Sequence, residues 1–283
     1  MTEYIVVGRS NGTTRLGSPY CNLKIKNQEE EIGVAVWDVS PDEGPVVGQL
    51  VSFVNIQLND GKRSARKGDM RPGIMPDASH PLYGLLPRPV DRDVWNATVK
   101  NLIAMCGDSP LKTVIADVAE KLYVPYSQFP AASSIHHAFR GGLLNHTYQM
   151  LHMLEGLAPC MPYPIHIDHC VIAILFHDYG KVQTYSRDGE AQPEDALLGH
   201  IYISAVALQR ELERREIPVD EIQRIIHIVL SHHGQKEWGS PVLPCSQEAM
   251  VVHVLDNLSA KTDTIECSGN MEYVSPLGTR VVK

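Results

Sequence analysis

The sequence predicts an α+β protein of two domains, a small N-terminal β-barrel or sandwich followed by an all-α domain. Its 283 residues are too many for one average domain and sufficient for two. The hydrophobic pattern is typical of strands up to residue 58 and of helices beyond residue 91. Five prolines lie between Arg71 and Arg92, where the pattern changes. We therefore place the domain boundary in this proline-rich stretch.

The first domain, residues 1–70, is predicted from short β-rich runs separated by turn residues. The runs are Tyr4 to Gly8, Tyr20 to Lys26, Ile32 to Trp37 and Leu50 to Leu58. The stretch 60–71 is predicted as a loop, and it carries five basic residues against two acidic ones. A solvated loop and a phosphate-contacting arm fit it equally well. The residues proposed for such an arm are Lys62, Arg63, Arg66 and Lys67.

Residues 71–92 are predicted to be an extended linker, because proline at this density excludes a long helix. The remainder, residues 93–283, has helical periodicity. Helices are predicted at Asp93 to Cys106, Leu111 to Leu122, Gly142 to Leu157, Ile165 to His177, Asp195 to Arg215, Asp220 to Ser231 and Gln247 to Lys261.

Composition and charge exclude several classes of protein. With 43% hydrophobic and 20% charged residues and no low-complexity tract, the chain is typical of a globular protein. The longest apolar run, Cys170 to Phe176, is far shorter than the roughly 20 residues of a membrane span, and no signal-peptide pattern precedes the domains. We expect a cytoplasmic protein without a membrane partner.

The net charge of −8 is unevenly distributed, and it disfavours a protein that coats long nucleic-acid duplexes. Residues 1–92 hold 11 basic and 11 acidic side chains, whereas the rest holds 14 and 22. The acidic excess therefore lies entirely in the second domain. A domain that binds cations would show this excess.

One motif in the second domain is typical of metal binding. In I-L-F-H-D-Y-G-K, residues 174–181, an apolar helix leads to adjacent His177 and Asp178 and stops at Gly180. An imidazole beside a carboxylate offers a mixed nitrogen and oxygen site, and the two carboxylate oxygens could bridge two cations. The dipeptide alone is weak evidence, but other histidines and an aspartate accompany it. These are His146 in G-G-L-L-N-H-T, His200 in L-L-G-H-I, His232 and His233 in L-S-H-H-G, and Asp256 in H-V-L-D-N-L-S-A-K.

The order of these residues along the chain resembles the HD superfamily of metal-dependent phosphohydrolases. The resemblance implies an HD domain with a first metal on His146, His177, Asp178 and Asp256. It also implies a second metal that shares Asp178 and is completed by His200, His232 and His233. The alternative for the first set is a cluster of buried polar groups paired among themselves, and for the last three a role as supporting or surface histidines.

Longer stretches resemble the YhaM-type 3′-to-5′ exoribonucleases, which place an OB-fold before an HD domain. They are S-S-I-H-H-A-F-R-G-G-L-L-N-H-T at 133–147, H-D-Y-G-K, L-L-G-H-I and S-H-H-G-Q-K-E-W-G-S-P. The resemblance implies an OB-like barrel that binds single-stranded nucleic acid and a phosphodiesterase that degrades RNA, with DNA as a second substrate to consider. Two divalent ions are expected, with Mn²⁺ favoured over Fe, Mg²⁺, Zn²⁺, Co²⁺ or Ni²⁺.

Four further residues are candidates for contact with the substrate. Lys181 and Arg140 are predicted to contact the phosphate, and His136 or His137 to protonate the leaving ribose oxygen or contact the next phosphate. Lys181 could instead only favour the helix dipole, Arg140 could pair with an acidic side chain, and the two histidines could be ordinary loop residues.

Two other functions compete with RNA degradation. The same metal pattern serves HD phosphohydrolases of small nucleotides or cyclic dinucleotides, although Trp238-Gly239-Ser240-Pro241 follows His233 where the cyclic di-GMP enzymes carry Gly-Tyr-Pro. The chain could also be a non-catalytic nucleic-acid-binding protein that senses nucleotides, but a complete ligand set argues against this. A homo-oligomer is compatible with the sequence, and no heptad assigns one.

Overall fold

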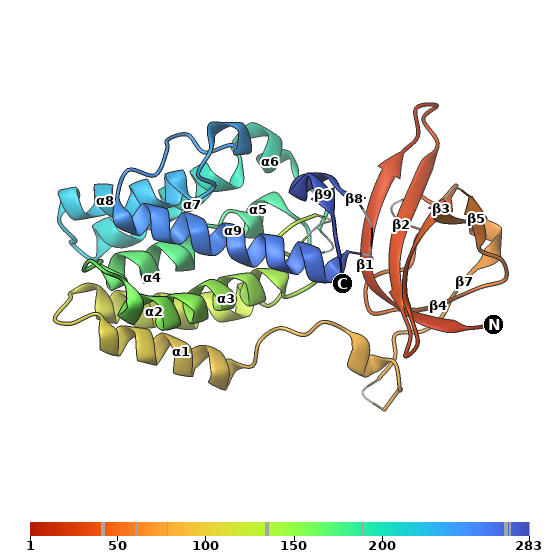
Figure 1. Cartoon of the computed structure of the whole chain (residues 1–283), viewed down its shortest axis with the longest axis horizontal. Helices are drawn as coiled ribbons and strands as arrows, with labels where there is room; N and C mark the ends of the chain where they lie inside the picture. Colours follow the sequence, from red (N-terminus) through yellow and green to blue (C-terminus); the bar gives the residue numbers. More distant parts are fainter. Residues whose placement is uncertain are drawn as a thin grey trace.

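The computed structural model describes the chain except residues 41–42, 60, 78, 134–135, 188, 269–270, 272 and 283. Figure 1 shows the N-terminal strands gathered at one end of the molecule and the helices at the other, with the linker running between them. Within the described residues, no helix is both long enough and apolar enough to cross a membrane. The predicted α+β class is confirmed.

The N-terminal domain is a curled sheet of seven strands that forms an OB-like half-barrel. Its strands are β1 (Glu3–Thr13), β2 (Pro19–Lys26), β3 (Glu31–Trp37), β4 (Leu50–Phe53), β5 (Gln57–Asn59), β6 (Lys62–Arg66) and β7 (Met70–Pro72). The spatial order is β5-β6-β3-β2-β1-β4-β7, and all neighbours are antiparallel except β3 and β6. Along β2, the buried Cys21, Leu23 and Ile25 alternate with more exposed residues, which is the period-two pattern of a sheet with one covered face.

Two sequence-based expectations in this domain are wrong. The single strand predicted from Leu50 to Leu58 is divided into β4 and β5. The stretch predicted as a loop contains β6, and the 3-10 helix η1 (Lys67–Asp69) leads from β6 to β7; Asp60, at the start of that stretch, lies outside the described residues. The hydrophobic signal of β6 is weak because Ala65 alone of its residues is buried, as suits a short hairpin near the edge of the sheet.

The linker connects β7 to the first long helix and contains the short 3-10 helix η2 (Tyr83–Leu85). It is joined to the barrel by His80, whose Nε2 lies 3.3 Å from a carboxylate oxygen of Glu3. The sheet extends two residues past the predicted domain limit of residue 70.

The C-terminal domain is helical and surrounds one hydrophobic core. Its helices are α1 (Arg92–Met105), α2 (Leu111–Tyr126), α3 (Gly142–Leu157), α4 (Ile167–Phe176), α5 (Lys181–Thr184), α6 (Pro193–Leu197), α7 (His200–Arg214), α8 (Val219–Ser231) and α9 (Gln247–Cys267). The 3-10 turns η3 (Ala158–Cys160), η4 (Lys236–Trp238) and η5 (Ser275–Leu277) and a hairpin of β8 (Tyr273–Val274) and β9 (Thr279–Arg280) complete it. This hairpin departs from the predicted all-α domain.

One predicted helix, Asp195 to Arg215, is wrong as a single element. The chain breaks between α6 and α7 at Gly199, whose φ of +70° lies in the region that favours glycine. A new helix therefore begins at His200. The break places this histidine on the first residue of α7 instead of in the middle of a helix.

Helix α4 lies at the centre of the helical domain. It packs against α2, α8 and α9, and all of its residues except Ile167 are buried. A helix buried on every side has no polar face, which explains the continuous apolar run in the sequence. Its C-terminus delivers His177 and Asp178 to the interior of the domain.

Candidate metal centre

The turn after α4 holds His177 and Asp178 inside the protein, at 0% and 1% exposure. The ring nitrogen Nδ1 of His177 pairs with the backbone oxygen of Ile174 at 2.7 Å. Two residues on, Gly180 packs so closely on α7 that a Cβ atom would lie 2.2 Å from the carbonyl oxygen of His200. Only glycine fits this approach, which brings His200 next to Asp178.

A first group of potential ligands consists of His146 on α3, His177 and Asp256 on α9. One ligand atom from each lies within 4.8 Å of the others. Asp178 faces the same group, because its Oδ2 lies 3.3 Å from Nε2 of His177 and 3.8 Å from Nε2 of His146. These are the residues that the resemblance assigns to a first metal.

A second group consists of His200 on α7 with His232 and His233 after α8, again with ligand atoms within 4.8 Å. The other oxygen of Asp178, Oδ1, lies 3.4 Å from Nε2 of His200 and 3.9 Å from Nε2 of His232. Asp178 therefore stands between the groups and turns one oxygen toward each. The structure brings together all seven predicted ligand residues.

The buried polar atoms of this centre fit divalent cations. Nε2 of His177, His200 and His232 and Oδ1 of Asp178 have no hydrogen-bond partner among the described residues. Leaving such atoms unpaired away from water is costly, and four of them together at one place call for a bound partner. Imidazole nitrogens and carboxylate oxygens are ligands for divalent transition ions, so a bound cation would satisfy all four atoms.

Backbone carbonyls orient the imidazoles for this purpose. Nδ1 of His232 pairs with the oxygen of Val229 at 2.6 Å, and Nδ1 of His233 with the oxygen of Trp238 at 2.6 Å. A hydrogen on Nδ1 leaves Nε2 with a free lone pair, the form that binds metals. The turn that holds the pair is fixed by His253, whose Nδ1 contacts the oxygen of His232 at 2.8 Å.

His146 is oriented by two side chains that sequence reasoning missed. The Ser259 hydroxyl donates to Oε1 of Gln149 at 2.7 Å, so its oxygen accepts from Nδ1 of His146 at 2.9 Å. Nε2 of His146 lies 3.0 Å from Oδ1 of Asp256. An imidazole nitrogen and a carboxylate oxygen at this distance suit a shared cation. The signal was available, because Ser259 and Gln149 each lie three residues after a predicted ligand on the same helix.

The electrostatics keep Asp178, His200 and His232 in their metal-binding protonation states. Burial raises the pKa of Asp178, but Lys181 and His177 outweigh it and hold this pKa well below its usual range. Burial, together with the charge of Lys181, lowers the pKa of His200 to about 3, and burial also takes the pKa of His232 well below its usual value. The carboxylate is thus charged and both imidazoles are neutral near pH 7.

Lys181 is buried, and its Nζ donates to Oδ2 of Asp178 at 2.7 Å. This contact neutralises the carboxylate that faces both groups. An ammonium has three donors, so further donors remain for an anion beside Asp178. The alternative that Lys181 serves only the dipole of a helix end is disfavoured, because its charge lies inside the centre.

The two histidines of the 133–147 motif have different surroundings. His137 is 2% exposed, its backbone N–H donates to Asp263 at 2.6 Å, and its φ is +46°. The His136 ring lies 5.7 Å from that of His146, and its Nδ1 is buried without a partner. Burial lowers the pKa of His136 to about 3 and that of His137 to about 4. Both ring nitrogens of His137, like Nδ1 of His136, are buried without a hydrogen-bond partner among the described residues, so either ring is available to a substrate.

The remaining candidates lie outside the centre. Arg140 is exposed and donates from Nε to Oε1 of Gln128 at 3.1 Å, and it forms no ion pair with a carboxylate of the described residues. Lys62, Arg63 and Arg66 lie on β6, which pairs with β5 on the side of the half-barrel away from the helices in Figure 1, and Lys67 pairs with Glu43 at 2.8 Å.

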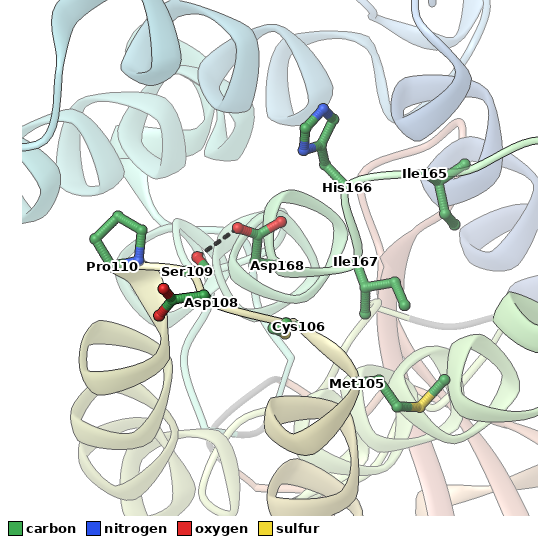
Figure 2. Close-up of a pocket in the computed structure, with 10 residues that line it drawn as sticks. Met105, Cys106, Asp108, Ser109, Pro110, Ile165, His166, Ile167 and Asp168 are labelled. Carbon is green, nitrogen blue, oxygen red and sulfur yellow. Dashed lines mark hydrogen bonds between the residues drawn. The ribbon is translucent and has the colours of Figure 1, made fainter.

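A cavity of about 330 Å³ lies at the other end of α4, between the α1–α2 connection and residues 165–168. Figure 2 shows the Asp168 carboxylate turned toward Ser109, whose hydroxyl donates to it at 2.6 Å. Ligand atoms of His166, Asp168 and His169 also lie within 4.8 Å of one another here. However, Asp168 accepts a second hydrogen bond from the backbone N–H of His169, and Nε2 of His169 lies 3.3 Å from Oε1 of Glu221. The potential metal-ligand atoms of Asp168 and His169 therefore already have partners.

The half-barrel, the buried helix α4 and the paired His and Asp groups define the class of protein. The HD domain family matches residues 143–261, which contain the complete ligand set. The 3′-5′ exoribonuclease YhaM of Geobacillus sp. (strain WCH70) is 30% identical over 94% of this chain and 83% of its own length. The YhaM proteins of Bacillus velezensis and Bacillus subtilis are 28% and 27% identical over 91% and 97% of this chain and 83% and 88% of their own lengths.

The chain belongs to the YhaM family of 3′-5′ exoribonucleases, as the resemblance predicted. No solved structure gives a significant match. The similarity to the Bacillus subtilis protein covers 97% of this chain and therefore both domains.

Proposed function

We propose that this chain is a metal-dependent 3′-5′ exoribonuclease that hydrolyses single-stranded RNA at a centre of two divalent ions. The observation that carries the proposal is the set of four buried, unpartnered ligand atoms around Asp178. Membership of the YhaM family, whose curated members are named 3′-5′ exoribonucleases, supports the substrate class and the direction.

The ligands of the first ion are proposed to be His146, His177, Asp178 and Asp256. Those of the second are proposed to be Asp178, His200, His232 and His233. Such ions supply an attacking hydroxide at neutral pH and neutralise charge on the phosphoryl oxygens. Mn²⁺ is the proposed metal, because it accepts mixed nitrogen and oxygen donors.

The protein's own side chains have distinct roles in this proposal. Lys181 holds the charge of Asp178 and offers its remaining donors to the phosphate. His136 or His137 contacts the departing ribose oxygen or the adjacent phosphate through an unpaired ring nitrogen. The backbone N–H of His137 also holds this loop through its bond to Asp263. Arg140 contacts the phosphate backbone from the rim of the site.

The proposal is tested with a 5′-labelled single-stranded RNA, Mn²⁺ and the purified protein, beside the Asp178→Asn variant. We expect a ladder of progressively shorter labelled products that the variant does not form. Asp108→Asn, at an exposed position near the other end of α4, is the matched control and should degrade RNA like the wild type. The same oligonucleotide in DNA measures the preference for RNA.

Intact RNA in the presence of bound metal would contradict the proposal and favour a small nucleotide or cyclic dinucleotide as substrate. Release of the labelled 5′ nucleotide as the first product would contradict the direction. A protein that binds RNA, holds no metal and cleaves nothing would favour the non-catalytic alternative.

A further inference from the structure

A small pocket lies where the half-barrel meets the helical domain. Its volume is about 150 Å³, and residues of both domains line it. The barrel contributes the loop before β4 and the start of the linker, and the helical domain contributes the loop before α3 and the loop after α5. The lining residues that matter here are Val46, Met75, Phe139, Arg140 and Arg187.

The pocket presents two cations without an acidic partner. In the described part of the chain, neither Arg140 nor Arg187 forms an ion pair with a carboxylate, and both are exposed. Gln128, a neutral amide, orients Arg140 and occupies only some of its five donors. Two like charges at one pocket repel each other, and an anion bound between them would relieve this repulsion.

The rest of the pocket is apolar. Met75 and Val46 on the barrel side are 59% and 37% exposed, and Phe139 faces the pocket from the helical side. Exposed apolar side chains next to guanidinium groups suit an unpaired base, which has an apolar face for contact and a phosphate at its edge. A duplex would hide its bases from such a surface.

The pocket is next to the metal centre. The ring of Phe139 lies 6.3 Å from that of His137, which lies 5.4 Å from that of the proposed ligand His146. Arg187 belongs to the loop that follows Lys181 and α5. This loop is tied to the barrel by Asn11, which donates to Glu190 at 2.6 Å.

We propose that this pocket, here called the junction pocket, binds a nucleotide of single-stranded RNA that lies upstream of the bond being cleaved. The phosphate contacts Arg140 and Arg187, and the base contacts Met75 and Val46. The proposal builds on the proposed exoribonuclease function and assigns the barrel a part in it. It also places the barrel's contact with the strand at the domain junction, not at the basic residues of β6.

The first test compares substrates of two lengths with the metal-loaded protein. Arg187→Ala should lower kcat/KM for a ten-nucleotide RNA about tenfold, because a charge-assisted contact is lost. A dinucleotide without a 5′ phosphate has no phosphate upstream of the cleaved bond for Arg187 to contact, so the ratio of kcat/KM for the ten-nucleotide RNA to kcat/KM for the dinucleotide should fall as well. Arg224→Ala removes the same charge from the exposed face of α8, and should leave the ratio at the wild-type value.

Met75→Asp tests the barrel side of the pocket, because it places a negative charge where the base and phosphate would lie. It should lower the same ratio. In addition, Arg187→Ala should reduce the slope of log affinity against log salt by about 0.7, the value for one phosphate contact on a single strand. Affinity is measured by fluorescence polarisation of 5′-labelled RNA with the Asp178→Asn protein, which does not consume the probe.

Equal ratios for the wild type and Arg187→Ala would overturn the junction pocket while leaving the exoribonuclease function in place. If the wild type shortens no RNA, the proposed function fails, and the polarisation measurement decides the pocket by itself. In that case, equal affinities and salt slopes with and without Arg187 would overturn it.

Discussion

The two halves of the metal centre differ in charge and in exposure. The first half contains the Asp256 carboxylate beside His146 and His177, and both imidazoles are fully buried. The second half contains three imidazoles, and the His200 side chain is 16% exposed. Asp178 contributes one oxygen to each half.

This difference predicts that the two proposed ions would be held unequally. A divalent cation in the first half meets the charge of Asp256 in addition to that of Asp178, whereas one in the second half meets that of Asp178 alone. The second half is also closer to solvent, where an ion exchanges more readily. We expect the ion of the first half to be structural as well as catalytic, and that of the second half to be lost first on dialysis against a chelator.

Removal of the shared carboxylate should have the largest effect, because it weakens both halves. Asp178→Asn is expected to lower the rate of RNA cleavage about a thousandfold or more. It also leaves Lys181 buried without its partner, which should destabilise the fold by about 3 kcal/mol. Cleavage rates, elemental analysis and thermal unfolding measure these effects. An unchanged metal content would show that Asp178 is not the shared ligand.

Loss of one imidazole from each half should separate the two ions. His146→Ala is expected to remove the first ion, lower the midpoint of thermal unfolding and abolish cleavage. His233→Ala is expected to keep the first ion and the wild-type midpoint of thermal unfolding. Its cleavage rate should be about a hundredfold lower at low Mn²⁺ concentration and should recover partly at high Mn²⁺ concentration. Metal content and cleavage rate are measured for both variants across a Mn²⁺ titration. Equal loss of metal by the two variants would contradict the predicted difference between the two halves.

The Ser259 hydroxyl tests how much the orientation of one ligand matters in the first half. It contacts His146 and is not itself a proposed ligand. Ser259→Ala should weaken metal affinity of the first half by roughly tenfold to a hundredfold. Thr262→Ala, which removes an exposed hydroxyl on the same helix, is the matched control and should bind metal like the wild type. A competition titration with a metal indicator measures both. Equal affinities would mean that His146 is oriented without Ser259.

The smallest predicted effect is on the stability of the metal-free protein in acid. The folded pKa values of His136 and His200 are about 3 and that of His137 about 4, all below the unfolded value of about 6.5. Between about pH 6.5 and the folded pKa values, the unfolded chain therefore binds more protons than the folded chain. The contribution of these histidines to the free energy of unfolding is complete above about pH 6.5 and declines as the pH falls toward about 4. His177, whose pKa is raised by Asp178 against burial, opposes the trend in part.

Thermal unfolding of chelator-treated protein between pH 7.5 and 4.5 measures this decline. His200→Gln should flatten it, because one of the contributing histidines is removed. A midpoint that rose on acidification would contradict the prediction.

The fold class followed from local patterns, and the errors occurred where local pattern is weakest. The strands β2 and β3 and the helices α1 to α4 lie close to their predicted positions because their apolar residues repeat with the period of the element. Strand β6 was missed because it buries one residue, and the break at Gly199 was missed because the apolar period of α7 continues across it. The hairpin β8–β9 is too short to show a period.

The sequence by itself determined the types of ligand and their order along the chain, because imidazole and carboxylate chemistry is a property of residues. It also assigned the family through its motifs. Only the tertiary structure shows that these residues meet, since Asp178 faces His146 from α3 and His200 from α7, and His146 faces Asp256 from α9, across distances that no spacing encodes. The same holds for Ser259, Gln149 and the junction pocket. Their partners lie far away in the sequence, and burial and close packing alone bring them together.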